Sequence, residues 1–291
     1  MEVHEREVHT PWEGVLATPA GRSRAAVLVL AGSSGRVDRE RARLLAGQGL
    51  TALAVRWFGG PGQSPGICEI PLETFTSAIG LLRSTGASRI GVLGVSKGAE
   101  AALLTAVRDP RVDVVVAVSP TDSVWCNVGP GPDGRHHPYR SSWSWRGEPL
   151  PFLPMDDSWT PGTPAGEPVG MTAWYELSRR TFGHLLPGAA IPVERARAAL
   201  VLVAGGDDAM WPSLPAAERL ALRRRRAGAP VTLISRAGAG HRPRFPGEGV
   251  LPASAAHLHG GTPHADALLG EDAWPRVVSA LRGTPADRPV G

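Results

Sequence analysis

The sequence predicts an α/β fold built on a mainly parallel, doubly wound sheet, and three observations support this. Short apolar runs rich in β-branched residues recur along the 291-residue chain. None of them alternates cleanly between apolar and polar residues, as expected for strands that are covered on both faces. Amphipathic helical segments lie between the runs, and this alternation is typical of a parallel sheet, here of about 6–8 strands.

The apolar runs place the core strands in chain order at residues 26–30, 52–55, 90–93, 114–118, 199–203 and 231–234. The amphipathic segments place helices at residues 38–46, 72–83, 97–108, 214–226 and 272–281. We expect residues 1–24 to form a short hairpin that covers one edge of the sheet. Because all the strands fit one core, we expect a single domain over residues 1–291.

Composition and charge exclude several classes of protein. With 42% hydrophobic and 20% charged residues, the chain is not mostly disordered. Its longest apolar runs have the length of strands, so we expect no membrane span. The net charge of +4 comes from arginines spread along the chain, with Lys97 as its one lysine. The dense run Arg223 to Arg226 is interpreted as a solvated helix face, so we expect no nucleic-acid partner.

Cofactors, metals and disulfides are also not expected. Cys68 and Cys126 cannot form a disulfide framework or a CxxC-type zinc site. No P-loop or strand-linked dinucleotide motif is present, and the histidine spacings do not match a metal site. Residues 1–6 are charged and lack the apolar segment of a secretory signal, which favours a cytoplasmic location.

The strongest local motif is GVSKG at residues 94–98, which follows one predicted strand and opens a helix. This is the strand–turn–helix context of a nucleophile elbow. The glycines allow a sharp turn that holds Ser96 at the edge of the sheet. The backbone N–H of Lys97, at the helix N-terminus, can then face a developing oxyanion. The alternative is a glycine-rich turn in a small-molecule binding fold.

A nucleophilic serine needs a base and the base needs an orienting acid, in the chain order serine, acid, histidine for this type of elbow. Asp208 follows the strand at 199–203 and is the better candidate for the acid, with Asp207 as runner-up. The other aspartate is then free to cap the next helix. His241 follows the strand at 231–234 in a glycine-rich loop and is the candidate base.

A second oxyanion donor is expected from the loop after the first core strand. That loop reads AGSSG at residues 31–35, and the backbone N–H groups of Ser33 and Ser34 are both candidates. The sequence does not choose between these two serines. The alternative interpretation is a simple turn between a strand and a helix.

Residues 120–187 break the alternation of strands and helices. They are rich in proline, glycine and serine and hold five of the nine tryptophans. A loop of this length inside one domain is usually functional, and disordered segments are poor in aromatic residues. We therefore expect a cap insertion over the carboxyl edge of the sheet.

Several of these motifs resemble those of the acyl-CoA thioesterase / bile acid-CoA:amino acid N-acyltransferase family. The resemblance is carried by the elbow GVSKGAE, the acid loop GDDAMWPS, the histidine loop GAGH, and the segments ARLLAGQG, GGTPHA and DAW. It covers roughly residues 25–283 by this motif comparison.

The resemblance implies an α/β-hydrolase fold with Ser96 as nucleophile, Asp208 as acid and His241 as base. It implies a small-molecule acyl thioester as substrate, carried by CoA or by a carrier protein. The serine, in place of the cysteine of the amino-acid acyltransferase members, favours hydrolysis. Animal members carry an additional N-terminal β-sandwich domain, which we do not expect here. Because an acyl site needs apolar walls, we expect the pocket to be lined by Trp143, Trp145, Trp159 and Trp211.

Three other functions stay open at this point. The same acyl-enzyme could pass its acyl group to an amine or an internal nucleophile, as an acyltransferase or cyclase does. An ester or lactone hydrolase of the dienelactone-hydrolase type shares the fold and the order of the triad. A non-catalytic binding module on a degenerate hydrolase fold is the fourth function, and the intact candidate triad argues against it. The sequence does not indicate an oligomeric state.

Overall fold

Eight strands form one sheet in a computed structural model, which describes residues 2–137 and 139–284. The strand order is β1-β2-β4-β3-β6-β7-β10-β11. The core strands are β3 (Ala25–Leu30), β4 (Thr51–Val55), β6 (Arg89–Val95), β7 (Val114–Val118), β10 (Ala199–Gly205) and β11 (Val231–Arg236). All neighbours from β4 to β11 pair in parallel, which confirms the predicted fold class.

The first strands extend this sheet at one edge. β1 (Val3–Val8) and β2 (Gly14–Pro19) form the predicted hairpin, and β2 continues antiparallel onto β4. The hairpin therefore covers the edge of β4 by adding two strands to the sheet. An ion pair of 2.8 Å between Arg39 and Glu5 ties the outermost strand to the first helix.

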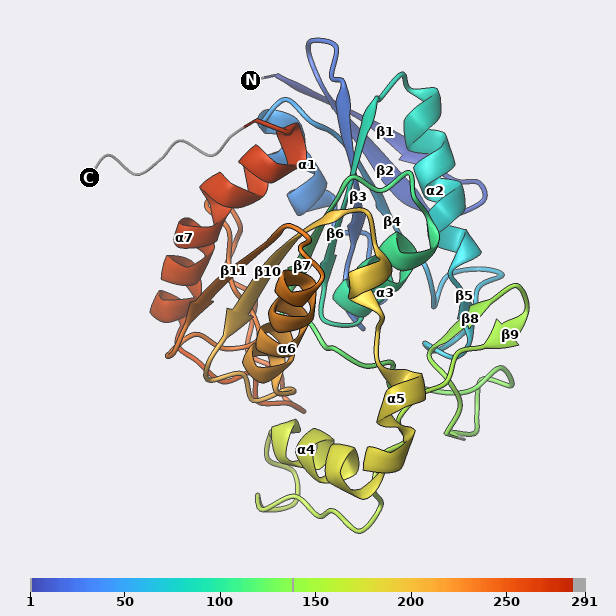
Figure 1. The fold of residues 1–291 in the computed structure, drawn as a ribbon, viewed down its shortest axis with the longest axis vertical. Helices are drawn as coiled ribbons and strands as arrows, with labels where there is room; N and C mark the ends of the chain where they lie inside the picture. The colour runs from blue at the N-terminus through green and yellow to red at the C-terminus, as the bar shows by residue number, and fades with distance from the viewer. Residues whose placement is uncertain (1, 138, 285–291) are drawn as a thin grey trace.

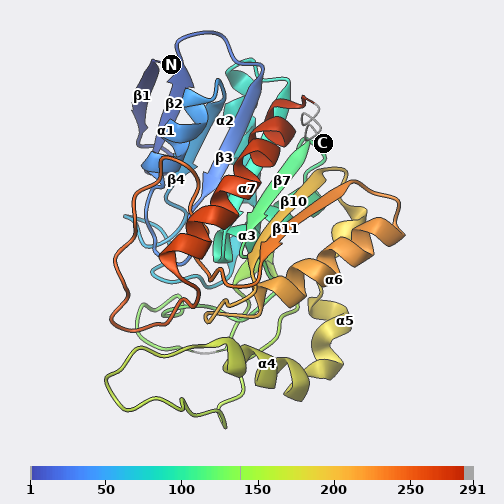
Figure 2. The same cartoon turned by 90° about the vertical axis from the view of Figure 1, so that its left-hand side faces the viewer.

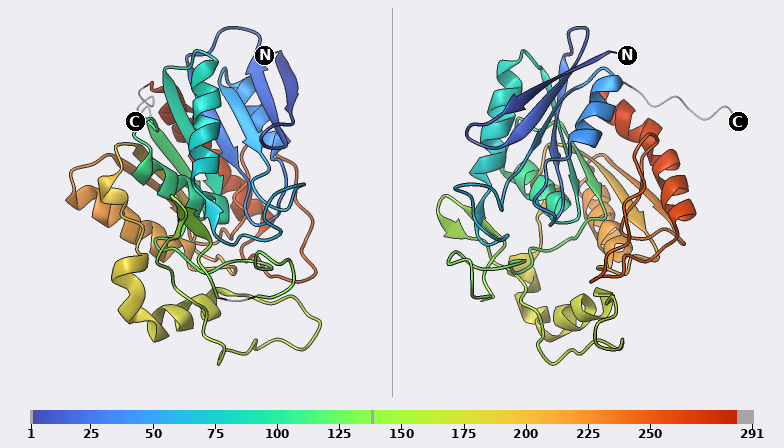
Figure 3. Two further views of the ribbon diagram at one scale, coloured as in Figure 1. Left: turned by 90° about the vertical axis from the view of Figure 1, so that its right-hand side faces the viewer. Right: turned by 180° about the vertical axis from the view of Figure 1, so that it is seen from behind.

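Helices cover both faces of the sheet. One face carries α1 (Arg39–Gly47) and α7 (Pro263–Arg282), which lie in front of the strands in Figure 2. The other carries α2 (Glu73–Ser84), α3 (Lys97–Arg108) and α6 (Ser213–Arg226), and the left panel of Figure 3 is turned toward it. The alternation of side chains along each strand explains these two layers. Val27 and Val29 of β3 pack with α1 and α7, whereas Leu28 packs in the opposite layer.

Two helical segments differ from what the sequence pattern predicts. α7 begins at Pro263 and not at residue 272, because the Thr262 side chain caps it by accepting the N–H of Ala265. In the arginine run of α6, Arg224 is fully buried and not solvated. Its guanidinium donates to backbone carbonyls of the segment that leads into β10, including that of Ala198 at 2.6 Å. No helix in the described part of the chain is long and apolar enough to span a membrane.

Residues 120–187 leave the sheet directly after β7 and lie below the carboxyl ends of its strands (Figures 1 and 2). Their short strands β8 (Trp143–Trp145) and β9 (Glu148–Pro149) join β5 (Ile70–Pro71) in a second, three-stranded sheet. The segment also contains α4 (Thr172–Thr181). The chain then returns to β10 through η1 (Gly183–Leu185), α5 (Leu186–Ala189) and η2 (Val193–Arg195).

Candidate active site

Ser96 occupies the turn between β6 and α3, with φ 55° and ψ −120°. A non-glycine residue held at such a positive φ costs of the order of 1–3 kcal/mol, which the surrounding structure must offset. A Cβ on Gly94 would lie 2.1 Å from the carbonyl oxygen of Gly98, and a Cβ on Gly98 would lie 2.5 Å from that of Leu30. The two glycines of the motif are therefore what allows the backbone to make this sharp turn.

The loop after β3 lies against Ser96. A Cβ on Gly32 would come within 3.2 Å of the Ser96 Cβ, which is a tight contact, so this close approach favours glycine. Ser33, Ser34 and Lys97 line the same cavity as Ser96. As the first residue of α3, Lys97 has no acceptor for its N–H within the helix. All three candidate oxyanion donors therefore surround the cavity that contains the serine.

Asp208 and His241 meet in the loops that follow β10 and β11. Both side chains are buried, and Nδ1 of His241 lies 2.8 Å from Oδ2 of Asp208. The other carboxylate oxygen accepts the backbone N–H groups of Met210 at 2.9 Å and of Trp211 at 3.3 Å. These contacts fix the orientation of the carboxylate and leave the Nε2 edge of the imidazole turned away from it.

Asp207 makes a different contact. It is exposed, and its carboxylate accepts the backbone N–H of Gly261 at 2.9 Å, which holds the loop before α7. Neither aspartate caps α6, because the N-cap position is Pro212 and carries no side-chain hydrogen bond. Of the two adjacent acids, only Asp208 is hydrogen-bonded to the histidine.

Ser119 joins the loops of the site, and the sequence analysis missed it. The residue is fully buried directly after β7, with φ 48°. Its hydroxyl donates to the backbone carbonyl of His241 at 2.9 Å, and its own carbonyl accepts the Trp211 indole N–H at 3.1 Å. Its place at the carboxyl end of a central strand is the signal that could have identified it.

Lys97 and Glu100 form a buried ion pair next to the elbow, at 2.9 Å. The ammonium group of Lys97 also donates to the hydroxyl of Ser142 at 2.8 Å. The second oxygen of Glu100 accepts the indole N–H of Trp143 at 2.8 Å and the backbone N–H of Trp125 at 3.1 Å. Because both charges are compensated, burial is tolerated here. The network joins the start of α3 to the segment 120–187.

Ser96 lines a cavity of about 590 Å³. The large side chains around it come mainly from the segment 120–187 and from the acid loop, and Arg242, His257 and His259 join them from the chain after β11. Most are apolar or aromatic, and they include Met155, Met171, Trp174, Tyr175, Met210 and Trp211. Trp211 also packs edge-on against the His241 ring, at 5.9 Å between ring centroids. The walls of the cavity thus suit an apolar ligand with one polar reacting group.

Three of the tryptophans predicted for these walls lie elsewhere. Trp143 is fully buried in the core, Trp145 packs beside the guanidinium of Arg108, and Trp159 stacks on Trp174 with 5.3 Å between ring centroids. The composition of the segment identifies it as rich in tryptophan but does not say which way each indole points. Trp174, which the prediction did not include, lines the cavity instead.

His259 is a second histidine beside the candidate base. Its ring centroid lies 6.1 Å from that of His241, and its backbone carbonyl accepts the His241 N–H at 2.8 Å. Burial, with the positive charge of Arg242 next in importance, lowers the pKa of His259 to about 4. His259 is therefore neutral near pH 7. Among the described residues, no cluster of three or more histidine, cysteine or acidic side chains could hold a metal ion.

We expect the protein to lose stability as the pH falls from 6.5 toward about 4, and His259 to contribute to this loss. In that range His259 binds a proton in the unfolded chain but stays neutral in the folded chain. The free energy of unfolding therefore decreases as the pH falls. The melting temperature of His259→Gln should therefore drop less between about pH 7 and about pH 5 than that of the wild type. His4→Gln, on the exposed outer strand, is the control. Equal drops in His259→Gln and wild type would contradict this assignment.

Comparisons with known proteins identify relatives of this chain. The family model described as BAAT / Acyl-CoA thioester hydrolase C terminal matches residues 70–283. Acyl-coenzyme A thioesterase 2, mitochondrial, of Mus musculus is 27% identical over 94% of this chain and 61% of its own length. Acyl-coenzyme A thioesterase 1 of Homo sapiens is 26% identical over 84% of this chain and 56% of its own length. The chain thus spans about three-fifths of the length of these relatives.

Solved structures share the fold. A putative dienelactone hydrolase from Klebsiella pneumoniae superposes with a TM-score of 0.54 at 14% identity, over 96% of this chain and 98% of that one. A puromycin-hydrolyzing peptidase from Mycobacterium tuberculosis gives a TM-score of 0.60 at 13% identity, over 100% of this chain and 40% of that one. These likenesses show an α/β-hydrolase fold. Together with the family match, which covers most of the sequence, they lead to one assignment: the chain belongs to the BAAT / acyl-CoA thioester hydrolase C-terminal family.

Proposed function

We propose that this protein is a serine hydrolase that cleaves acyl thioesters through an acyl-enzyme on Ser96. The observation that carries the proposal is the buried 2.8 Å contact between Nδ1 of His241 and Asp208, at the sheet edge where the Ser96 elbow opens. Family membership supports thioesters as the substrate class, because the relatives are named acyl-coenzyme A thioesterases. The apolar cavity next to Ser96 supports an acyl chain as the bound group.

In the proposed reaction, the Ser96 hydroxyl attacks the thioester carbonyl while Nε2 of His241 takes its proton. Asp208 keeps the Nδ1 proton in place and stabilises the imidazolium that forms. The developing oxyanion is bound by the backbone N–H of Lys97 and by that of Ser33 or Ser34. The C–S bond then breaks and the imidazolium protonates the leaving thiolate. Water activated by His241 finally hydrolyses the acyl-enzyme.

Residues 120–187 act in this proposal as a cap within a single hydrolase domain. Their side chains Met155, Trp174 and Tyr175 form one wall of the cavity that contains Ser96. The buried pair of Lys97 and Glu100 connects this segment to the elbow. In this proposal the cap encloses the acyl group and excludes bulk water during the reaction.

Intact-protein mass spectrometry with a panel of acyl thioesters tests the proposed function. We expect a mass increase equal to the acyl group, located on Ser96 by peptide mapping, that decays in water. Release of the acyl group onto an added amine in preference to water would instead indicate an acyltransferase. Absence of both acylation and thioester cleavage across the panel would contradict the proposal.

A pair of tryptophan variants tests the assignment of the acyl cavity. Trp174→Leu removes an aromatic wall, so the relative kcat/KM for short and long acyl chains should shift by about tenfold. Trp143→Leu changes a tryptophan that does not line the cavity, and it should lower the free energy of unfolding by about 3 kcal/mol instead. Chain-length profiles and urea unfolding measure the two effects. An unchanged chain-length profile for Trp174→Leu would place the acyl group elsewhere.

A further inference from the structure

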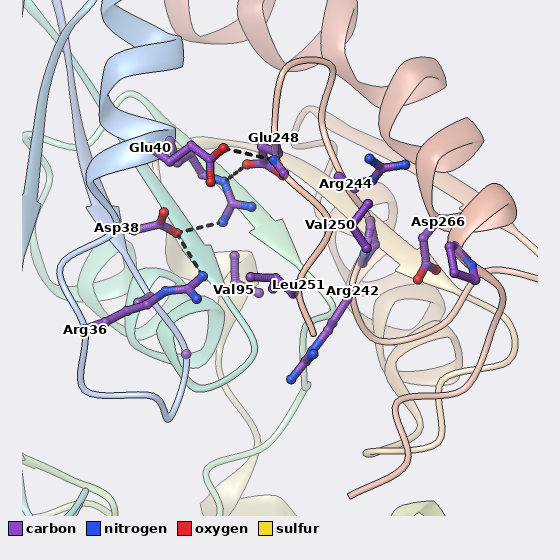
Figure 4. A pocket seen from close by; sticks show the side chains of 16 residues that line it. Arg36, Asp38, Glu40, Val95, Arg242, Arg244, Glu248, Val250, Leu251 and Asp266 are labelled. Carbon is purple, nitrogen blue, oxygen red and sulfur yellow. Dashed lines mark hydrogen bonds and ion pairs between the residues drawn. The ribbon is translucent and has the colours of Figure 1, made fainter. Parts of the chain in front are cut away.

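A second hollow reaches the same elbow. It measures about 140 Å³ and lies between the loop after β3 and the chain that follows His241 (Figure 4). Gly32 and Val95 line it, and these residues immediately precede Ser33 and Ser96. We call it the arginine hollow, after its lining residues Arg36, Arg41, Arg242 and Arg244. Among the described residues, Arg242 alone lines both this hollow and the larger cavity.

The arginines of the hollow differ in how their charges are compensated. Arg41 forms ion pairs of 2.6 Å with Glu248 and 3.2 Å with Asp38. Arg36 is half exposed, and its guanidinium lies 4.0 Å from the Asp38 carboxylate, which also forms the ion pair with Arg41. Arg242 forms no ion pair within residues 2–137 and 139–284. Arg244 has no ion pair there either, but in Figure 4 it lies on the far side of the hollow from Arg36. On the side of Arg36, positive charge therefore remains at Arg36 and Arg242.

The other acids of the hollow are engaged by backbone groups. Glu40 accepts the N–H of Gly249 at 2.9 Å, and Asp266 accepts the N–H of Gly240 at 2.7 Å. Both carboxylates thus stabilise the loops that form the walls. Neither forms an ion pair with Arg36 or Arg242 in the described part of the chain.

Arg242 holds its charge in unfavourable surroundings. Burial lowers the pKa of the Arg242 guanidinium, and the nearby positive charge of Arg36 lowers it further. Its side chain donates to the carbonyl of Pro252 at 2.9 Å. A guanidinium carries several more N–H donors, in a fork that matches phosphate oxygens. An anion bound by Arg36 and Arg242, whose side chains come from facing loops in Figure 4, would relieve their mutual repulsion.

A thioester has an acyl arm and a thiol arm, and the chemistry of its cleavage indicates which of the two hollows each arm occupies. The leaving sulfur must receive its proton from His241, so the thiol arm departs on the side of that residue. Arg242 is the next residue along the chain. Val250 and Leu251, which are 68% and 42% exposed, line the arginine hollow and offer apolar contacts to the uncharged part of an arm. The acyl arm then occupies the larger, aromatic cavity.

We propose that Arg36 and Arg242 bind a phosphate group on the thiol arm of the substrate. This inference rests on the proposed thioester hydrolysis and adds a phosphate-binding site to it. The shared ligand chemistry is a phosphate ester at the end of a pantetheine thiol. Either CoA or the prosthetic arm of a carrier protein supplies that chemistry.

The test compares one acyl group on three thiols: CoA, 4′-phosphopantetheine and N-acetylcysteamine, the last of which carries no phosphate. The variants are Arg36→Gln, Arg242→Gln and the double variant. Arg225→Gln, at an exposed position of α6, is the charge-matched control. We expect the ratio of kcat/KM for acyl-CoA to that for acyl-N-acetylcysteamine to fall about tenfold in each single variant, mainly through KM. The ratio should keep its wild-type value in Arg225→Gln.

The outcomes separate this proposal from the proposed function. Turnover of none of the three thioesters by the wild type would overturn the hydrolase assignment itself. If the double variant turned over the thioesters and kept the wild-type ratio of kcat/KM for acyl-CoA to that for acyl-N-acetylcysteamine, only the phosphate site would be overturned. If the arginine variants lose kcat/KM for both acyl-CoA and acyl-phosphopantetheine, the result supports binding of the phosphate at the end of the pantetheine arm. A loss confined to acyl-CoA would overturn the proposed site, because the arginines would then bind a nucleotide phosphate that phosphopantetheine lacks.

Discussion

Ser96→Ala is expected to abolish the acyl-enzyme and to lower kcat for thioester hydrolysis by about 10⁵- to 10⁶-fold. Loss of the nucleophile in a serine triad leaves only the catalysis that comes from the oxyanion hole and from substrate binding. Alanine keeps the Cβ, so the strained φ of 55° and the packing of the elbow should persist. Turnover kinetics, intact mass and thermal unfolding measure the three effects separately.

Ser84→Ala, an exposed serine at the end of α2, controls for the loss of a hydroxyl group elsewhere. It should leave both turnover and the melting temperature close to the wild-type values. If Ser96→Ala instead retained near-normal turnover while remaining folded, another residue would have to be the nucleophile.

Asp208→Asn should lower kcat by about 10⁴-fold, whereas Asp207→Asn should remain close to the wild type. The reason lies in the two backbone N–H groups that bind one oxygen of Asp208. In the asparagine variant the amide oxygen must take that position, so its NH₂ group faces Nδ1 of His241. Nδ1 then has to accept a hydrogen bond, and the proton moves to Nε2, where the base must be free.

Asp207→Asn is the matched control, because an asparagine there keeps an oxygen for the N–H of Gly261. Both variants remove one negative charge from the same loop, so a general change in electrostatics would affect them alike. The measurement is kcat under substrate saturation, with circular dichroism to show that both variants fold. Greater damage from Asp207→Asn would reverse the assignment of the acid.

The strands and the contact between Asp208 and His241 could be predicted because their signals are local. A strand buried on both faces needs a continuous apolar run, and the turn at Ser96 needs glycine on either side. The parallel arrangement then brings the ends of β6, β10 and β11 to one edge, which is where Asp208 and His241 meet. The order of motifs along the chain was therefore enough to select these residues.

The cavity wall, the buried arginine of α6 and the role of Ser119 could not be predicted, because they depend on partners that are distant in the sequence. Trp143 and Trp174 belong to the same tryptophan-rich segment, yet one packs in the core and the other lines the cavity. Arg224 is buried because four carbonyls outside α6 accept its hydrogen bonds. Ser119 becomes part of the site only because β7 lies between β6 and β10 in the sheet. A local pattern can place Ser119 at the end of a strand, but no local pattern encodes which partners these side chains meet.

The burial of Lys97 has a consequence for the chemical resistance of the protein. Acyl thioesters modify exposed amines without help from an enzyme, and lysine side chains are their usual targets in proteins. The sequence has a single lysine, which is 2% exposed and ion-paired, while arginines supply the rest of the 31 basic side chains. Guanidinium groups stay protonated and do not act as nucleophiles near neutral pH. Repeated exposure to reactive thioesters should therefore leave no acyl-lysine on the surface of this protein.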